Sequence, residues 1–252
     1  MKIVKVINEN KDVRTFFLDT PLYSKPGQFY MVWIPGVDEK PFALSYQGKK
    51  PAITVEKKGK ATRALFRMKK GDELFLRGPY GNHFKQEKHA CVVAGGLGII
   101  PLINLIPKLG HPQIIYGARS KGNLLFRDRI GRASYCTDDG SFGSKGFTTE
   151  ILEKKLGEKK IGIVYACGPE IMMKKVVDLC NKHKIKCQVS LERYMGCGIG
   201  ICGSCACNDK LVCKDGPIFN SSQLKKMPDF GKQALLKSSR KVSLKEFFEW
   251  RG

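Results

Sequence analysis

Half of the cysteines in this sequence lie in one short segment. Five of the ten fall between positions 197 and 213, and four of these follow the pattern C-x4-C-x2-C with a further cysteine after seven intervening residues. In a reducing compartment such a cluster more often binds metal than forms disulfides. The C-x4-C-x2-C…C spacing is that of [2Fe–2S] clusters, in which each iron takes two cysteine sulfurs. A zinc site, where C-x2-C pairs dominate, is the alternative.

Glycines alternate with these cysteines, at Gly196, Gly198, Gly200 and Gly203. A loop around a cluster must bring backbone N–H groups close to sulfur, and glycine permits such a path. The spacing and the glycines together favour an iron–sulfur cluster over zinc. Cys207 falls outside the pattern and is interpreted as a bystander thiol.

The remaining sequence shows two successive patterns. Residues 1–88 contain short apolar runs broken by Pro, Gly and Asn, which is typical of a small antiparallel β-barrel, with one helix predicted over 61–71. Residues 89–188 alternate strand-like and helical runs, which indicates a parallel sheet covered by helices. Residues 189–252 are Cys- and Gly-rich and end in a polar tail. We therefore expect three domains of β and α/β class, over 1–88, 89–188 and 189–252.

The positive charge of the chain is spread evenly. Lys and Arg number 45 against 23 Asp and Glu, and the excess is +9, +8 and +5 over residues 1–88, 89–188 and 189–252. Basic and aromatic residues are not interleaved as in a nucleic-acid platform, so we expect no nucleic-acid partner. No apolar run approaches the ~20 residues of a membrane-spanning helix, and the start has no signal-peptide pattern. A cytoplasmic protein without a membrane partner is predicted.

Two segments of the central domain are candidate ligand sites. A strand runs into the turn Gly95-Gly96-Leu97-Gly98 and then a helix, an arrangement whose N–H groups bind phosphate, although a plain tight turn explains it about as well. Cys167-Gly168-Pro169 follows a later strand of the same sheet, where ligands of open α/β sheets bind, or is a buried cysteine before a helix. The polar loop 137–146 leaves another strand and either meets a ribose or diphosphate or faces solvent.

Two segments of the barrel form a third candidate. The run from Lys40 to Ser45 reads as a strand that carries a cation, and the run from Gly59 to Thr62 begins a short helix. Such a pair is able to hold a flavin diphosphate, or is an ordinary strand and an ordinary capped helix.

Taken in order, these segments resemble the ferredoxin-reductase-type flavoproteins, which combine a flavin barrel, a GG-x-G-x-x-P nicotinamide domain ending in CGP, and a cysteine cluster. Within that group, LERYMGCGIGICGSC, CKDGPIF and FGK resemble the electron-transfer subunits of the type B dihydroorotate dehydrogenases. The resemblance covers essentially the whole chain.

The resemblance implies a role for each matching position. The [2Fe–2S] ligands would be Cys197, Cys202, Cys205 and Cys213. FAD would be bound by Lys40, Pro41, Phe42, Ala43, Thr54, Val55, Glu56, Ala61 and Thr62. NAD would be bound by Gly95, Gly96, Gly98, Gly168 and Pro169, with Cys167 as the catalytic residue that positions the nicotinamide rather than acting as a nucleophile.

The sequence departs from the family at three places. The usual Arg-Pro-x-Ser of the flavin motif reads Lys40-Pro41-Phe42-Ala43, which keeps the charge but loses the bidentate fork and a hydroxyl. The usual Gly-Thr pair reads Ala61-Thr62, and the interval before Cys213 is short.

The resemblance also implies the reaction. A partner subunit oxidises dihydroorotate at its own FMN, electrons pass singly through the cluster to FAD, and a hydride passes to NAD+, in a heterotetramer with two copies of each subunit. Two alternatives stay open: the same cofactors in a subunit of a hydrogenase, sulfite reductase or ferredoxin:NADP oxidoreductase, and a zinc- or nucleic-acid-binding module. The choice between NAD and NADP also stays open, because Arg119, Ser120 and Lys121 follow a strand where a 2′-phosphate would lie.

Overall fold

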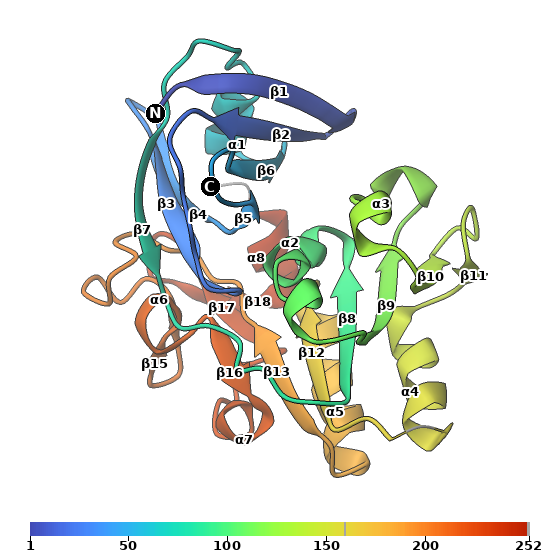
Figure 1. Ribbon diagram of the computed structural model, residues 1–252. Coiled ribbons are helices and arrows are strands. Elements are labelled where there is room, and N and C mark those ends of the chain that lie inside the picture. Colours follow the sequence, from blue (N-terminus) through green and yellow to red (C-terminus); the bar gives the residue numbers. More distant parts are fainter. Residues whose placement is uncertain (159, 251–252) are drawn as a thin grey trace. The chain divides into compact units, whose positions relative to one another are not determined.

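A computed structural model describes residues 1–158 and 160–250 of the chain (Figure 1). The chain folds into two compact units. The first contains Met1–His83, Glu192–Pro217 and the segment from Lys232 onward, and the second contains Phe84–Leu191 and Ile218–Gly231. The C-terminal part of the chain therefore contributes to both units. The division into three domains at 88 and 188 stays a prediction.

Two antiparallel sheets form most of the first unit. The four-stranded sheet has the order β1-β2-β6-β5 and the three-stranded sheet the order β4-β3-β7. The strands are β1 (Ile3–Asn10), β2 (Val13–Leu18), β3 (Phe29–Ile34), β4 (Asp38–Phe42), β5 (Leu44–Tyr46), β6 (Ala52–Glu56) and β7 (Phe75–Tyr80). A bridge between Lys2 and Glu73 joins the start of β1 to the residues before β7, which links the two sheets.

The two sheets enclose one apolar core. Side chains of β2, β3 and β6 alternate inward, and Phe16, Val32 and Ile53 are fully buried in this core. Such alternation is expected where one face of an antiparallel sheet is packed. The helix predicted over 61–71 is shorter than the sequence suggests: α1 spans Lys60–Leu65. Beyond Leu65 the backbone turns more tightly, because the amide of Met68 bonds to the carbonyl of Leu65.

A seven-stranded sheet forms the second unit, with the order β11-β10-β9-β8-β12-β13-β16. All neighbours in it are parallel except β13 and β16. The strands are β8 (Ala90–Gly95), β9 (Gln113–Ala118), β10 (Ser134–Thr137), β11 (Ser144–Lys145), β12 (Ile163–Cys167), β13 (Lys186–Ser190) and β16 (Ile218–Asn220). The helices are α2 (Ile99–Ile103), α3 (Arg127–Ile130), α4 (Thr148–Glu158), α5 (Glu170–Lys182) and α7 (Ser221–Leu224).

The order of these strands creates a switch point between β8 and β12. From β8 the chain proceeds to β9, β10 and β11 on one side, and then crosses to β12 and β13 on the other (Figure 1). Every residue of β8 is buried, as expected of a central parallel strand covered on both faces. Ligands of open α/β sheets bind beyond the carboxyl ends of the strands at such a point.

The cysteine segment has little regular structure. It contains the short hairpin of β14 (Ala206–Cys207) and β15 (Lys210–Leu211), followed by α6 (Val212–Asp215). The later segment forms the hairpin of β17 (Gln233–Leu235) and β18 (Lys241–Ser243) and the helix α8 (Leu244–Glu249), which share a small apolar cluster with Tyr194 and Trp250. None of the helices in the described residues combines the length and the apolar character that crossing a bilayer requires.

Candidate functional site

The four cysteines of the predicted cluster site form two pairs. The thiols of Cys197 and Cys202 lie within hydrogen-bonding reach of each other, and so do those of Cys205 and Cys213. A two-iron cluster needs two protein sulfurs on each iron, so this donor set fits it. In the described part of the chain, no three His, Cys, Asp or Glu side chains are grouped closely enough to hold one metal ion.

Backbone N–H groups of the same loop point at the sulfurs. Cys197 Sγ accepts hydrogen bonds from the amides of Ile201 and Cys202 at 3.3 and 3.4 Å. Cys213 Sγ accepts one from Gly200 at 3.2 Å, and Cys205 Sγ one from the amide of Cys213 at 3.4 Å. Hydrogen bonds to sulfur stabilise its anionic form, as a ligand sulfur requires.

The pKa values of two thiols respond to this environment in opposite directions. Burial raises the pKa of Cys197, but the amides of Cys202, Ile199 and Ile201 outweigh it and lower the value to about 6. Burial, together with the Cys205 thiol, raises the pKa of Cys213 to about 12. Cys197 therefore favours a thiolate more than Cys213 does.

Glycine allows the loop to take this path. Gly198 and Gly200 have φ of +72° and +82°, which L-residues rarely adopt. A Cβ on Gly198 would also lie 2.7 Å from Met31 Cγ, because the loop is seated directly on strand β3. The sequence pattern predicted that glycine was needed here, but not that Met31 was the neighbour.

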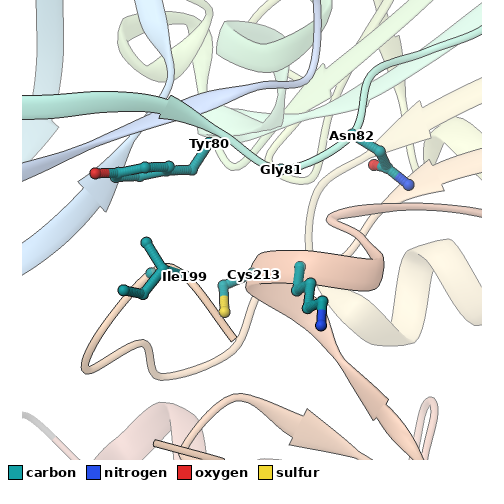
Figure 2. A pocket seen from close by; sticks show the side chains of 7 residues that line it. Tyr80, Gly81, Asn82, Ile199 and Cys213 are labelled. Atoms are coloured by element: carbon teal, nitrogen blue, oxygen red, sulfur yellow. The ribbon is translucent and has the colours of Figure 1, made fainter. Parts of the chain in front are cut away.

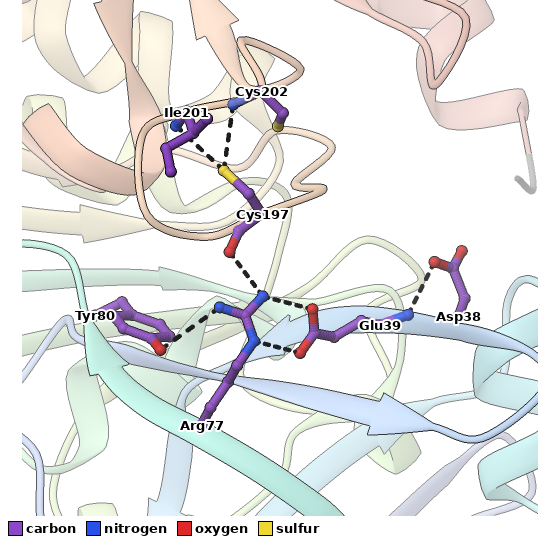
Figure 3. Close-up of polar contacts among 7 residues, drawn as sticks. All are labelled: Asp38, Glu39, Arg77, Tyr80, Cys197, Ile201 and Cys202. Carbon is purple, nitrogen blue, oxygen red and sulfur yellow. Dashed lines mark hydrogen bonds and ion pairs between the residues drawn. The ribbon is translucent and has the colours of Figure 1, made fainter.

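Arg77 ties the loop to the three-stranded sheet (Figure 3). Its Nη2 donates to the carbonyl oxygen of Cys197 at 2.7 Å, and its Nε and Nη2 donate to the carboxylate of Glu39 at 2.7 and 2.5 Å. Its Nη1 lies 3.5 Å from the hydroxyl of Tyr80. Hydrogen bonding to Glu39 raises the pKa of Arg77. The sequence pattern does not reveal Arg77 and Glu39, because no local motif marks them and the Cys197 carbonyl that Arg77 reaches lies far along the chain.

An open pocket of about 390 Å³ lies beside the buried cysteine pair. Figure 2 shows Tyr80 on one side and Ile199 and Cys213 on the other. Gly81, Asn82, Gly198 and Lys214 complete its lining. Asn82 holds this region together, since its amide donates to the carbonyl of Asp215 at 2.9 Å.

Cys207, the fifth cysteine of this segment, contacts a buried arginine. It is buried and accepts a hydrogen bond from Nη2 of the buried Arg193 at 3.3 Å. Another bond of Arg193 goes to the carbonyl of Gln233 in β17. This contact gives Cys207 a structural neighbour that the sequence did not reveal, and its bystander role stays a prediction.

The predicted flavin residues lie on β4, β6 and α1, which contact one another, except Ala43, which lies between β4 and β5. Lys40 lies on β4, where its Nζ is 2.6 Å from Asp38 Oδ2 and 4.6 Å from the ring centroid of Tyr194. Pro41, Phe42 and Ala43 follow it and are half-buried. At the start of α1, the hydroxyl of Thr62 accepts bonds from the amides of Lys58 and Gly59 at 2.8 and 3.0 Å.

The side chains of the predicted β6 residues differ in their availability to a cofactor. Thr54 is buried and its hydroxyl bonds to those of Ser45 and Thr15, each at 2.8 Å, while Val55 belongs to the apolar core. Only Glu56 is partly exposed, and it pairs with Lys58 at 2.7 Å. This corner therefore offers main-chain groups, the first amides of α1 and the ammonium of Lys40, which suit an anionic cofactor.

The predicted nicotinamide residues meet at the switch point of the parallel sheet. Cys167 at the end of β12 pairs with Ala94 of β8, so the two following loops lie side by side. A Cβ on Gly98 would lie 2.2 Å from the carbonyl oxygen of Cys167, and one on Gly95 2.9 Å from Pro169 Cδ. Close packing of the loops thus requires these glycines.

Gly96 is a different case from its neighbours. Its φ of +53° favours glycine, yet no atom lies within 4 Å of a Cβ built there. It is the glycine of this turn that faces open space, which suits the approach of a ligand to the backbone. The thiol of Cys167 is half-buried and contacts the carbonyl oxygen of Ser190 at 3.7 Å.

The polar loop over 137–146 closes on the turn that follows β9. Asp139 accepts bonds from the amide and hydroxyl of Ser141, and these bonds lower the pKa of Asp139. The hydroxyl of Ser141 in turn accepts from the amide of Lys121 at 2.8 Å. The structure thereby joins two segments that no sequence pattern connects.

Comparison with known proteins identifies close relatives of the chain. The sequence profile described as the iron-sulfur cluster binding domain of dihydroorotate dehydrogenase B matches residues 192–225. A Methanocaldococcus jannaschii protein named "Probable dihydroorotate dehydrogenase B (NAD(+)), electron transfer subunit" is 46% identical over 251 residues, 96% of each chain. A Pyrococcus horikoshii protein of the same name is 47% identical over 91% of this chain and 92% of its own.

Solved structures match the fold as well. A chain of an NADH-dependent reduced ferredoxin-NADP oxidoreductase gives a TM-score of 0.80 at 28% identity, over 91% of this chain and 92% of that one. The flavohem-like FAD/NAD binding domain of a Vibrio cholerae nitric oxide dioxygenase gives a TM-score of 0.59 at 19% identity, over 73% and 92%. The predicted fold class, an antiparallel β-barrel with a parallel α/β sheet and a C-terminal cysteine segment, is confirmed.

Proposed function

The chain belongs to the family of dihydroorotate dehydrogenase B electron-transfer subunits, and we propose that it passes electrons from a dihydroorotate-oxidising subunit to NAD+ in pyrimidine biosynthesis. It is an oxidoreductase subunit whose cofactors are FAD, a [2Fe–2S] cluster and NAD+. When bound, the cluster moves single electrons, the flavin exchanges one or two, and the nicotinamide takes a hydride.

The observation that carries this proposal is the pairing of the four cysteines. Cys197 with Cys202 and Cys205 with Cys213 would each hold one iron, and backbone N–H groups directed at the sulfurs support this assignment. In such sites N–H···S hydrogen bonds and solvent exposure set the reduction potential. The protein holds the sulfurs in place, orients the backbone amides toward them and excludes water from the side of the site that contains Cys205 and Cys213.

The loop also has a distinct outer side. Cys202 is exposed, whereas Cys205 and Cys213 are buried. Ile199 and Ile201 beside it are 46% and 78% exposed, which is unusual for isoleucine. We propose that the catalytic subunit approaches this side, and that two copies of each subunit assemble.

The flavin and nicotinamide are assigned to the remaining predicted residues. The start of α1 and the main chain of β4 and β6 would hold FAD, with Lys40 as the nearby cation. The open Gly96 turn and the Cys167–Pro169 turn would hold NAD+ at the switch point. Cys167 would position the nicotinamide, and its thiol contacts the backbone carbonyl oxygen of Ser190.

The 28% identical oxidoreductase chain favours a second candidate, in which the same cofactors serve a ferredoxin:NADP reaction. The relatives at 46% and 47% identity carry the dihydroorotate dehydrogenase name, and we therefore prefer that function.

Anaerobic purification of the full chain tests the proposal first. We expect FAD and about two irons per chain, and NADH-dependent reduction of ferricyanide. Co-purification from native lysate should then capture a second flavoprotein, and the pair should reduce NAD+ with dihydroorotate. A chain without iron and flavin contradicts the proposal. If the chain and its partner contain their cofactors but do not reduce NAD+ with dihydroorotate, the ferredoxin-linked candidate is supported.

A further inference from the structure

Two charged residues of the three-stranded sheet meet beneath the cysteine loop (Figure 3). Arg77 on β7 and Glu39 on β4 belong to the strands on either side of β3. The carboxylate accepts from both Nε and Nη2, so the pair is bidentate, and the same Nη2 also donates to the Cys197 carbonyl. A planar guanidinium holds such a geometry better than a lysine ammonium.

The register of the strands places this pair under the loop. Met31 on β3 pairs with Arg77, and Trp33 pairs with Glu39. Met31 is fully buried and meets the loop at Gly198, next to Cys197. Arg77 and Met31 thus support consecutive residues of the loop, one through a hydrogen bond and the other through packing.

We infer that Arg77 and Glu39 form a charge-matched clamp, which positions the Cys197 side of the loop and keeps either charge from shifting how readily a cluster held there accepts an electron. The inference rests on the proposed function, because it requires a cluster at Cys197. Reduction adds one negative charge, which a nearby cation favours and a nearby anion opposes. With the two charges matched, their net effect on reduction is small.

Substitution of Arg77 and substitution of Glu39 should shift the reduction potential of the cluster in opposite directions. In Arg77→Met the carboxylate of Glu39 is left unmatched, so reduction becomes harder and the potential falls. In Glu39→Gln the guanidinium is left unmatched beside the Cys197 carbonyl, so reduction becomes easier and the potential rises. The double variant, which lacks both charges, should return close to the wild-type potential.

The experiment is a redox titration of the full chain, followed by electron paramagnetic resonance of the reduced cluster. The three variants are compared with wild type and with Arg67→Met, which removes the same charge from an exposed position after α1. We expect shifts of opposite sign in the single variants, each near tenfold in the reduction equilibrium, or about 59 mV for one electron. Arg67→Met should leave the potential unchanged.

Iron and sulfide analysis separates the possible outcomes. Single variants that shift the potential in the same direction, or that lose iron equally without a shift, overturn the clamp and leave the proposed function intact. Wild-type chain without iron overturns the proposed function and the clamp together. If Arg77→Met does not retain the cluster, Arg77→Lys should keep the wild-type potential with a reduced iron content. Glu39→Gln still tests whether an unmatched guanidinium raises the reduction potential.

Discussion

Replacing Gly98 by alanine should force apart the two loops at the carboxyl ends of β8 and β12. Gly98 has φ of −60° and ψ of −10°, which alanine adopts without strain. The added carbon would nevertheless lie 2.2 Å from the carbonyl oxygen of Cys167 and 2.5 Å from the amide nitrogen of Gly168. Both neighbours are backbone atoms, so no side-chain rotation relieves the contact.

The size of the effect follows from these distances. Non-bonded heavy atoms prefer separations of about 3.5 Å, so the loops must move by about 1 Å. Overpacking of this kind costs about 1–3 kcal/mol. For a domain of this size, a loss of about 2 kcal/mol lowers Tm by about 4–8 °C. A displacement of about 1 Å at a site of hydride transfer costs about 100-fold in rate.

The assay pairs thermal unfolding with stopped-flow reduction of the bound flavin by NADH. Two further glycines serve as comparisons. Gly96→Ala meets no atom but must adopt φ of +53°, at a cost of about 1–2 kcal/mol. Gly157→Ala, in α4 and with nothing near its Cβ, should leave flavin reduction unchanged and stability unchanged or raised by up to about 1 kcal/mol.

The relative rates of flavin reduction in the three variants test whether the two loops are packed as described. We expect Gly98→Ala to slow flavin reduction by about 100-fold while iron and flavin contents stay at wild-type levels. If Gly98→Ala behaves like Gly157→Ala, the two loops are not packed as described, and the argument for a nicotinamide site at their junction fails with it.

Three further predictions concern the cluster, the buried thiols and the barrel. Cys202→Ser should abolish the reducible iron signal in electron paramagnetic resonance, whereas Cys207→Ser should keep it, because Cys207 contacts Arg193 instead; equal loss would refute the ligand assignment. Burial raises the pKa of Cys91 to about 12 and of Cys136 to about 11, against 9.0 for an exposed thiol. As the pH rises, the thiols of the unfolded state therefore lose their protons first, and the free energy of unfolding should fall above about pH 9, by up to about 1.4 kcal/mol per pH unit for each thiol. Urea titrations at pH 8 to 10.5 measure this free energy. A free energy of unfolding that does not change with pH would contradict the burial of the two thiols. Thr54→Val should lower the free energy of unfolding by about 1–2 kcal/mol, because the Thr54 hydroxyl is hydrogen-bonded to those of Ser45 and Thr15. The flavin content should stay at the wild-type level, and loss of flavin from the folded variant would disprove this prediction.

Some of the site could be predicted from the sequence because it is local. The four predicted cluster ligands lie within one segment, so their spacing alone indicates the kind of metal site. For the predicted flavin stretches, the sequence did not predict which side chains are already engaged within the protein. The sequence did not reveal that the hydroxyl of Thr54 is used within the barrel, nor that Lys40 pairs with Asp38 and faces Tyr194.

The sequence by itself determined the fold class and the chemistry of the cysteine loop, because hydrophobic periodicity and cysteine spacing act over short stretches of chain. Only the tertiary structure decided that Arg77 reaches Cys197, 120 positions away. That contact depends on the register of β3 and β7, which contains an irregularity between Phe29 and Met31. A slip of one residue turns every side chain of a strand to its other face, and no local pattern specifies where such a shift occurs. The same holds for Gly98 and Cys167, whose contact exists only because β8 and β12 are neighbours in the sheet.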